Sequence, residues 1–131
     1  MTIELWMLLA NSAILFILIM LQQLYIDLTA GPKYALSNRS EPITKSPLAG
    51  RIERAIANLK ENLLLFAPVV LVLAVAGVST KATQTGAILF FVARIVHAIT
   101  YVSGIILVRS LSWFAGIIGI GIMLSALFQH I

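Results

Sequence analysis

The sequence predicts an all-α integral membrane protein that folds as a four-helix bundle. Hydrophobic residues make up 60% of its 131 residues and charged residues only 11%. Soluble domains are about half apolar and about a quarter charged. Four apolar runs each approach the roughly 20 residues that a helix needs to cross a bilayer. Because backbone groups in lipid need internal partners, these runs are expected to be helices, and four spans cannot close a barrel.

The first helix is predicted over about residues 3–29. It carries Glu4 where a signal peptide has a basic region, and no small-residue cleavage site follows the apolar run. The run is also too long for the apolar core of a signal peptide. We therefore expect it to be retained as the first span.

The other helices are predicted over about residues 47–78, 83–107 and 110–130, with one long loop over about 30–46. The segment 30–50, which contains this loop and the start of the next helix, holds three of the four prolines, and the loop meets the helix at Ser46-Pro47. This pair fits an N-cap followed by proline at the first helical position. Residues 1–131 are thus expected to form a single membrane domain.

Six of the nine basic residues lie between the first two apolar runs: Lys33, Arg39, Lys45, Arg51, Arg54 and Lys60. Such clustering is typical of the cytoplasmic side of a multi-pass protein. It places both termini on the opposite side and argues against a nucleic-acid partner. The absence of cysteine excludes disulfides and zinc-thiolate sites, and two distant histidines do not predict a metal site.

Polar residues recur at helical spacing within two of the predicted spans. In the second helix, Arg51, Arg54, Asn58 and Glu61 share one face, and in the third, Arg94, His97 and Tyr101 do the same. Charges facing lipid are costly, so both stripes should face protein or a water-filled cavity. Counting from the predicted cytoplasmic ends of the helices gives Glu61 and Arg94 similar depths, which predicts an ion pair between them.

Arg109 is predicted to precede the fourth helix, where the helix dipole disfavours a cation. A bound anion would reverse that effect, and Ser110 with free backbone N–H groups would help to hold it. Together with Arg51 and Arg54, Arg109 predicts a cytoplasm-facing cavity for a small polyanion. Structural alternatives remain open: a purely structural Glu61–Arg94 pair, a core role for His97, and an interfacial anchor at Trp113.

Three stretches resemble motifs of one known family. They are RIERAIANLKENLLLFAP at 51–68, ARIVHAITY at 93–101 and RSLSW at 109–113. They resemble the second-, third- and fourth-helix motifs of the membrane-associated proteins in eicosanoid and glutathione metabolism, the MAPEG family. The resemblance covers most of the chain from Gly50 onward, and the four-helix layout is similar throughout.

The resemblance implies a homotrimer that binds glutathione as cosubstrate in clefts between subunits. It implies that Arg54, Asn58 and Glu61 hold the tripeptide with Arg51 nearby, and that His97 and Tyr101 line the site. Arg109, beside Ser110, would stabilise the glutathione thiolate, which gives these two residues and Tyr101 catalytic roles. Trp113, also in the site, stands where relatives often have tyrosine.

Departures from the family pattern narrow the expected function. Ala57 and Asn62 replace an arginine and a tyrosine found in the eicosanoid branches, and Gln22, Gln23 and Asp27 stand where several relatives have an arginine in the first helix. The resemblance then implies a microsomal-type glutathione transferase or peroxidase of a bacterial inner membrane. Apolar electrophiles or lipid hydroperoxides would reach it through membrane lipid. A non-catalytic scaffold, a lipid- or glutathione-binding protein and a small transporter remain open.

Overall fold

A computed structural model describes residues 1–130. Its helices are α1 (Ile3–Ala30), α2 (Pro32–Leu36), α3 (Pro47–Val75), α4 (Lys81–Ser103) and α5 (Ile106–Phe128). All except the short α2 are long and apolar enough to cross a membrane. The prediction of an all-α, four-helix integral membrane protein is therefore confirmed.

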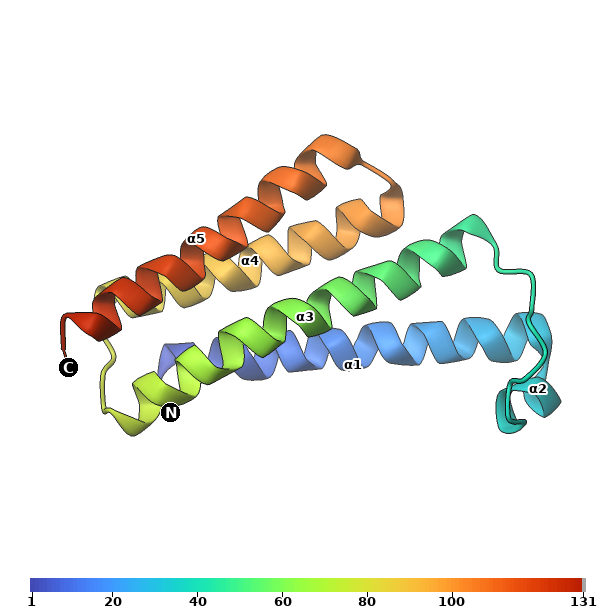
Figure 1. Ribbon diagram of the computed structural model, residues 1–131, viewed down its shortest axis with the longest axis horizontal. Coiled ribbons are helices and arrows are strands. Elements are labelled where there is room, and N and C mark those ends of the chain that lie inside the picture. Colours follow the sequence, from blue (N-terminus) through green and yellow to red (C-terminus); the bar gives the residue numbers. More distant parts are fainter. Residues whose placement is uncertain (131) are drawn as a thin grey trace.

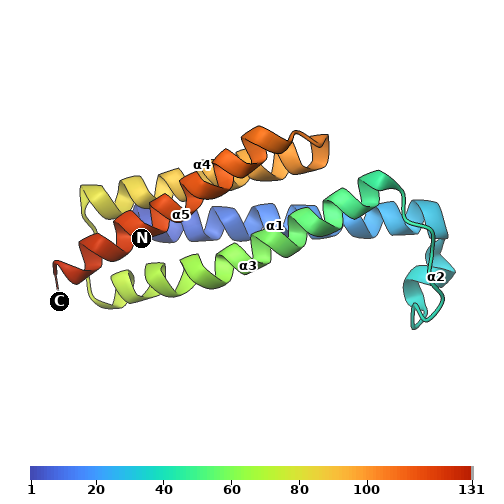
Figure 2. The same cartoon turned by 45° about the horizontal axis from the view of Figure 1, so that its top comes forward.

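The four long helices lie side by side in an antiparallel bundle (Figure 1). α1 packs against both α3 and α4, while α5 packs chiefly along α4. Both chain ends and the α3–α4 turn lie at one end of the bundle, as the rotated view in Figure 2 also shows. The loop of residues 31–46, with α2 inside it, lies at the other end, which we call the basic end.

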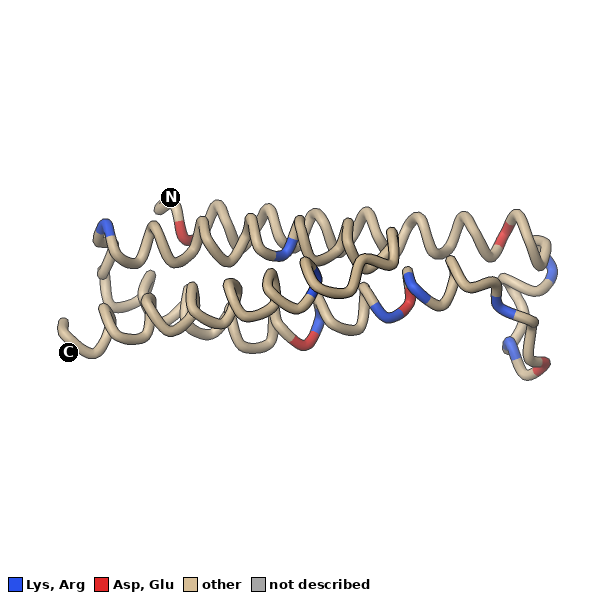
Figure 3. The backbone as a smooth tube through the Cα atoms, turned by 90° about the horizontal axis from the view of Figure 1, so that it is seen from above, with Lys and Arg blue, Asp and Glu red and all other residues tan. Residues whose placement is uncertain are grey.

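Charged residues are distributed unevenly along this bundle (Figure 3). Lys and Arg gather in the loop and along the first half of α3. The opposite end carries Lys81 at the start of α4 and Glu4 in the first turn of α1. This is the asymmetry on which the predicted orientation depends.

Capping residues set the ends of the helices. The observed ends differ from the predicted ends wherever the prediction followed the apolar run and not the cap. α3 begins at Pro47, as predicted, and the Ser46 hydroxyl accepts a hydrogen bond from the Ala49 N–H at 3.2 Å. α4 begins at Lys81 because Thr80 and Thr83 form a reciprocal capping box.

α4 ends at Ser103, four residues before its predicted end. Gly104 follows with φ of 80°, a left-handed conformation that glycine adopts without steric cost and that terminates the helix. α5 then begins at Ile106, not at residue 110. The turn between the last two helices is therefore Gly104-Ile105, and Arg109 lies inside α5.

The apolar core lies between α3, α4 and α5. The rings of Phe66 and Phe90 stack with their centroids 4.0 Å apart, and Met123 is fully buried beside them. One helical turn before Phe90, towards the start of α4, the backbones of α4 and α5 are in close contact at Gly86 and Gly119. A Cβ atom added to Gly119 would lie 2.6 Å from the Gly86 carbonyl oxygen, so only glycine fits this crossing.

Glu4 ties α1 to the start of α4. Its carboxylate is 1% exposed and accepts hydrogen bonds from the Ser79 hydroxyl at 3.1 and 3.2 Å and from the Thr83 hydroxyl. The N-terminal end of α4 also favours a negative group nearby. Glu4, whose acidic charge argues against a signal peptide, is thus a buried hydrogen-bond acceptor that joins two helices.

We expect Glu4→Ala to lower the free energy of unfolding by about 1.5–3 kcal/mol, because the buried Thr83 hydroxyl and the more exposed Ser79 hydroxyl lose a charged acceptor. Thermal unfolding of the detergent-solubilised protein, followed by circular dichroism, measures the change. Glu41→Ala, which removes an exposed loop carboxylate, is the control and should stay within about 0.5 kcal/mol of wild type. Equal melting temperatures for all three proteins would contradict the assigned role of Glu4.

Candidate functional site

The polar stripe of α4 faces α3 and α5 within the bundle. Arg94 is only 1% exposed and His97 is buried, while Tyr101 is half-buried nearer the basic end. His97 and Tyr101 contact edge to face, with ring centroids 5.5 Å apart. The three- and four-residue spacing therefore aligns these side chains along one inner face, as the sequence predicts.

Arg94 joins three helices through its guanidinium group. One terminal nitrogen donates to the Asn58 side-chain oxygen at 3.2 Å, and the other donates to the Ser112 and Trp113 carbonyls at 3.2 and 3.4 Å. Gly116 leaves the space for this group, since a Cβ atom there would lie 2.6 Å from the second nitrogen. All the hydrogen-bond acceptors that Arg94 has among residues 1–130 are neutral.

The predicted ion pair between Glu61 and Arg94 is wrong for the described chain. Glu61 is exposed, and the salt bridge found within residues 1–130 joins Lys45 and Glu53 instead. The pair does not form for two reasons. α4 ends four residues earlier than expected, which places Arg94 level with Asn58 and not with Glu61. Glu61 is also absent from the buried face of α3. Asn62, one position further, is the residue that faces inward.

His97 positions the start of α5. Its Nδ1 lies 3.0 Å from the Arg109 carbonyl oxygen, which can only accept, so the imidazole donates from Nδ1. The Ser112 hydroxyl donates to the same carbonyl at 2.7 Å. His97 Nε2 is buried without a hydrogen-bond partner in the described part of the chain. Together these contacts fix the backbone of Arg109.

The Arg109 side chain lies over the aromatic face of Tyr101, with its guanidinium carbon 4.8 Å from the ring centroid. A cation–π contact of this kind stabilises the charged group and holds its orientation. Arg109 is only half-buried. It is thus a fixed positive charge at the surface of the bundle.

The predicted anion site at the N-terminus of the fourth helix is corrected in the same region. Because α5 begins at Ile106, Arg109 and Ser110 lie past the first turn, where backbone N–H groups bond within the helix. The Ser110 hydroxyl donates back to the Ile106 carbonyl at 3.2 Å. Any anion here would be held by side chains and not by free backbone N–H groups.

A shallow cavity of about 290 Å³ brings most of the predicted site together. Its walls come from α3, α4 and α5, and it is lined by Asn58, His97, Tyr101, Arg109, Ser110, Trp113 and Phe114. Six of these residues are among the predicted site residues. The lining has one guanidinium and no carboxylate, so its fixed charge is positive.

Three of the predicted glutathione-binding residues lie outside this cavity, as does Arg94 of the predicted ion pair. Arg51 is half-buried at the basic end and donates to the Val102 carbonyl at 3.5 Å. Arg54 and Glu61 are exposed on the outer face of α3. The single chain therefore divides the predicted glutathione-binding set between the cavity and an open helix face.

Two residues of the site were missed from the sequence. Ser112 is buried against Arg109 and lies 3.4 Å from His97 Nδ1, while Phe114 lines the cavity beside Trp113. The signal for Ser112 was its spacing of three residues from Arg109, one helical turn away on the same face. In residues 1–130, no group of three His, Asp or Glu side chains could hold a metal ion.

Comparison with known proteins identifies the family. A search of curated proteins found no matching relative. A model of the MAPEG family matches residues 5–129, nearly the whole chain, including every residue of the cavity. The chain therefore belongs to the MAPEG family.

Proposed function

We propose that this protein is a glutathione-dependent membrane enzyme of the bacterial microsomal transferase type. It activates the glutathione thiolate for conjugation to apolar electrophiles or for reduction of lipid hydroperoxides. Membership of the MAPEG family supports a membrane glutathione-related function in general. The observation that carries the specific proposal is the cavity in which Arg109 lies over Tyr101.

The charge of the cavity suits the ligand. Glutathione has two carboxylates and one ammonium group, and its thiolate adds a further negative charge. The cavity offers a guanidinium, hydroxyl groups from Tyr101 and Ser110, and the Asn58 amide, without a carboxylate that would repel the thiolate. These groups can hold a small polyanion while the aromatic side chains limit water.

Arg109 is the residue proposed to activate the thiol. The thiolate is the nucleophilic form, and a nearby cation lowers the pKa of a bound thiol. Arginine keeps its charge at all physiological pH values, so it can stabilise the thiolate continuously. Because His97 and Ser112 hold the Arg109 backbone and Tyr101 holds its side chain, the charge is positioned before the ligand arrives.

Both reactions use this thiolate. In conjugation, the sulfur forms a bond to the electrophilic carbon, and the leaving group departs with its bonding electrons. In peroxide reduction, the sulfur attacks the terminal peroxide oxygen and the O–O bond breaks; the alkoxide takes the proton released by the thiol and leaves as an alcohol. A second glutathione reduces the sulfenic acid to give glutathione disulfide and water.

The exposed stripe of α3 is proposed to complete the site against a second copy of the chain, in a homotrimer. Arg54 and Glu61 are charged and exposed on a helix long and apolar enough to span a membrane. Charged groups at membrane depth are costly unless protein or water covers them. A neighbouring subunit would cover this face and bring Arg54 and Glu61 to a ligand that also contacts Arg109.

The test uses the purified protein in detergent. Stopped-flow ultraviolet absorbance should show thiolate formation when glutathione is added, and native mass spectrometry should report the number of chains and of bound glutathione molecules. Turnover with a panel of electrophiles and a lipid hydroperoxide completes the experiment. Binding that stabilises the protein without turnover would favour the non-catalytic alternative, and the absence of glutathione binding would contradict both.

A further inference from the structure

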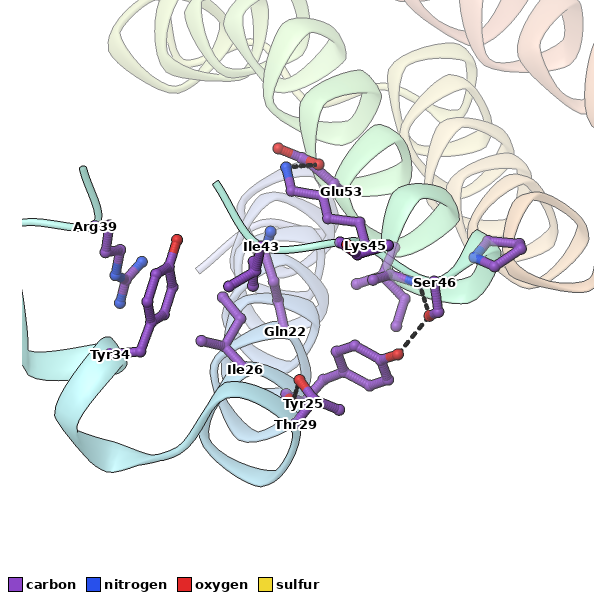
Figure 4. Close-up of a pocket in the computed structure, with 14 residues that line it drawn as sticks. Gln22, Tyr25, Ile26, Thr29, Tyr34, Arg39, Ile43, Lys45, Ser46 and Glu53 are labelled. Carbon is purple, nitrogen blue, oxygen red and sulfur yellow. Dashed lines mark hydrogen bonds and ion pairs between the residues drawn. The ribbon is translucent and has the colours of Figure 1, made fainter. Parts of the chain in front are cut away.

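A second and larger cavity lies at the basic end, and it shares no lining residue with the site described above. Its volume is about 630 Å³, and it lies between the end of α1, the loop after α2 and the start of α3 (Figure 4). Tyr25 and Ser46 are joined by a hydrogen bond on one side of it. We call it the loop pocket.

The loop pocket lies at the depth of the lipid headgroups. α1 has 28 residues and is about 42 Å long at 1.5 Å per residue, more than the roughly 30 Å of a hydrocarbon core. The polar cluster of Glu4, Ser79 and Thr83 marks one membrane boundary. Counting about 20 residues along α1 from there places the other boundary near Tyr25.

Apolar surface beside the loop pocket supports this depth. Leu28 on α1 is 78% exposed and Leu36 at the end of α2 is 89% exposed. Inside the pocket, Ile26, Ile43 and Ile52 form an apolar wall. The polar part of the lining has several hydroxyl groups, two cations and one carboxylate, that of Glu53, so its net charge is positive. The pocket therefore suits a molecule with one apolar and one anionic part.

The positive charge of the loop pocket comes from Arg39. Its guanidinium donates to the Gln23 side-chain oxygen at 3.0 Å and to the Ala35 carbonyl at 3.3 Å, and both acceptors are neutral. Lys45, the other cation of the lining, is paired with Glu53 at 2.7 Å. The pocket therefore keeps one unneutralised positive charge.

The backbone of Arg39 is itself unusual. Its φ of 53° is the one positive value among the non-glycine residues of the described chain. The Arg39 N–H donates to the Ser37 hydroxyl at 3.1 Å, which holds this turn. Residues with a Cβ atom adopt the left-handed conformation at a cost, and such costs are typical of positions that serve a ligand.

We propose that the loop pocket binds a phosphate group, that of an anionic phospholipid from the surrounding leaflet or of free inorganic phosphate. Arg39 donates to the phosphate oxygens, because a planar guanidinium matches their geometry. For the lipid, the apolar wall receives the glycerol and the first acyl carbons, and the chains continue over Leu28 and Leu36. The pocket is a binding site separate from glutathione chemistry.

The experiment titrates the full-length protein in detergent with phosphatidylglycerol, with phosphatidylcholine of the same acyl chains, and with inorganic phosphate. Native mass spectrometry counts the bound molecules. Arg39→Gln removes the free cation, and Ala49→Phe fills the pocket from α3. Lys33→Gln is the matched control, since Lys33 is an exposed cation near the same loop that does not line the pocket.

We expect Arg39→Gln to weaken phosphatidylglycerol binding about tenfold, the effect of losing one charge-assisted contact. Ala49→Phe should weaken it similarly, and Lys33→Gln should change it less than twofold. Arg39 is exposed, so its variant is expected to melt at the wild-type temperature and to bind glutathione normally.

The two sources of phosphate give different results. Phosphatidylglycerol binding that inorganic phosphate does not displace assigns the pocket to lipid, whereas Arg39-dependent binding of inorganic phosphate alone assigns it to the free ion. Equal binding of phosphatidylcholine and phosphatidylglycerol would overturn the proposal. An equal loss in Lys33→Gln and Arg39→Gln would overturn it too, since it would indicate general attraction to the basic end.

Discussion

Arg109→Ala is expected to abolish the thiolate absorbance signal on mixing with glutathione and to lower kcat/KM by about 10²–10³. This is the usual effect of removing one preorganised group that stabilises a developing charge. Arg109 is the only cation among the residues that line the site cavity, so no neighbour in that lining can replace it. Stopped-flow absorbance and steady-state turnover measure the two quantities.

Two control variants make this result specific. Arg109→Lys keeps the charge but loses the planar guanidinium that lies over Tyr101, so we expect an intermediate loss of about tenfold. Lys81→Ala removes a cation at the opposite end of the bundle and should leave turnover unchanged. An undiminished thiolate signal in Arg109→Ala would contradict the proposed mechanism even if glutathione still binds.

Gly119→Ala is expected to lower the free energy of unfolding by about 1–3 kcal/mol, the range for overpacking a close contact. The added methyl group would lie 2.6 Å from the Gly86 carbonyl oxygen and 3.0 Å from the Phe90 backbone nitrogen. Backbone atoms cannot turn aside as a flexible side chain can. α4 and α5 would have to separate, so thermal unfolding in detergent should begin at a lower temperature.

Gly121→Ala is the matched control for this substitution. It lies on the same helix two residues away, and an added Cβ atom there would meet nothing within 4 Å. Alanine is the better helix former, so Gly121→Ala is expected to be neutral or slightly stabilising. If both variants melted at the same temperature, the close crossing of α4 and α5 would not be a determinant of stability.

The presence of the four long helices could be predicted from the sequence because membrane insertion depends on long apolar runs. Their ends could not be predicted from those runs. Gly104 ends α4 inside a stretch that remains apolar through Val108, because the left-handed conformation that glycine permits stops a helix whatever the hydropathy. The Thr80–Thr83 capping box was a local signal that the apolar pattern concealed.

The part of the site that lies on one helix could be predicted, because helical spacing alone decides which of its residues share a face. Arg94, His97 and Tyr101 share a face for that reason, and Asn58 lies opposite them on α3. The partner of Arg94 was predicted wrongly because depth along two helices does not fix their rotation. Glu61 is one turn from Asn58, yet Asn62 faces the interior, and only packing between helices decides between such neighbours.

The unequal lengths of the helices have a consequence for kinetics. α3 projects beyond the α4–α5 turn at the basic end, so the bundle has a step there, with Arg51 against Val102 at its inner edge (Figure 1). The proposed thiolate forms close to that step, near the boundary of two phases. For an apolar second substrate, the effective concentration is then its mole fraction in the membrane. Adding inert lipid therefore dilutes this substrate, while the concentration of glutathione in the water stays constant.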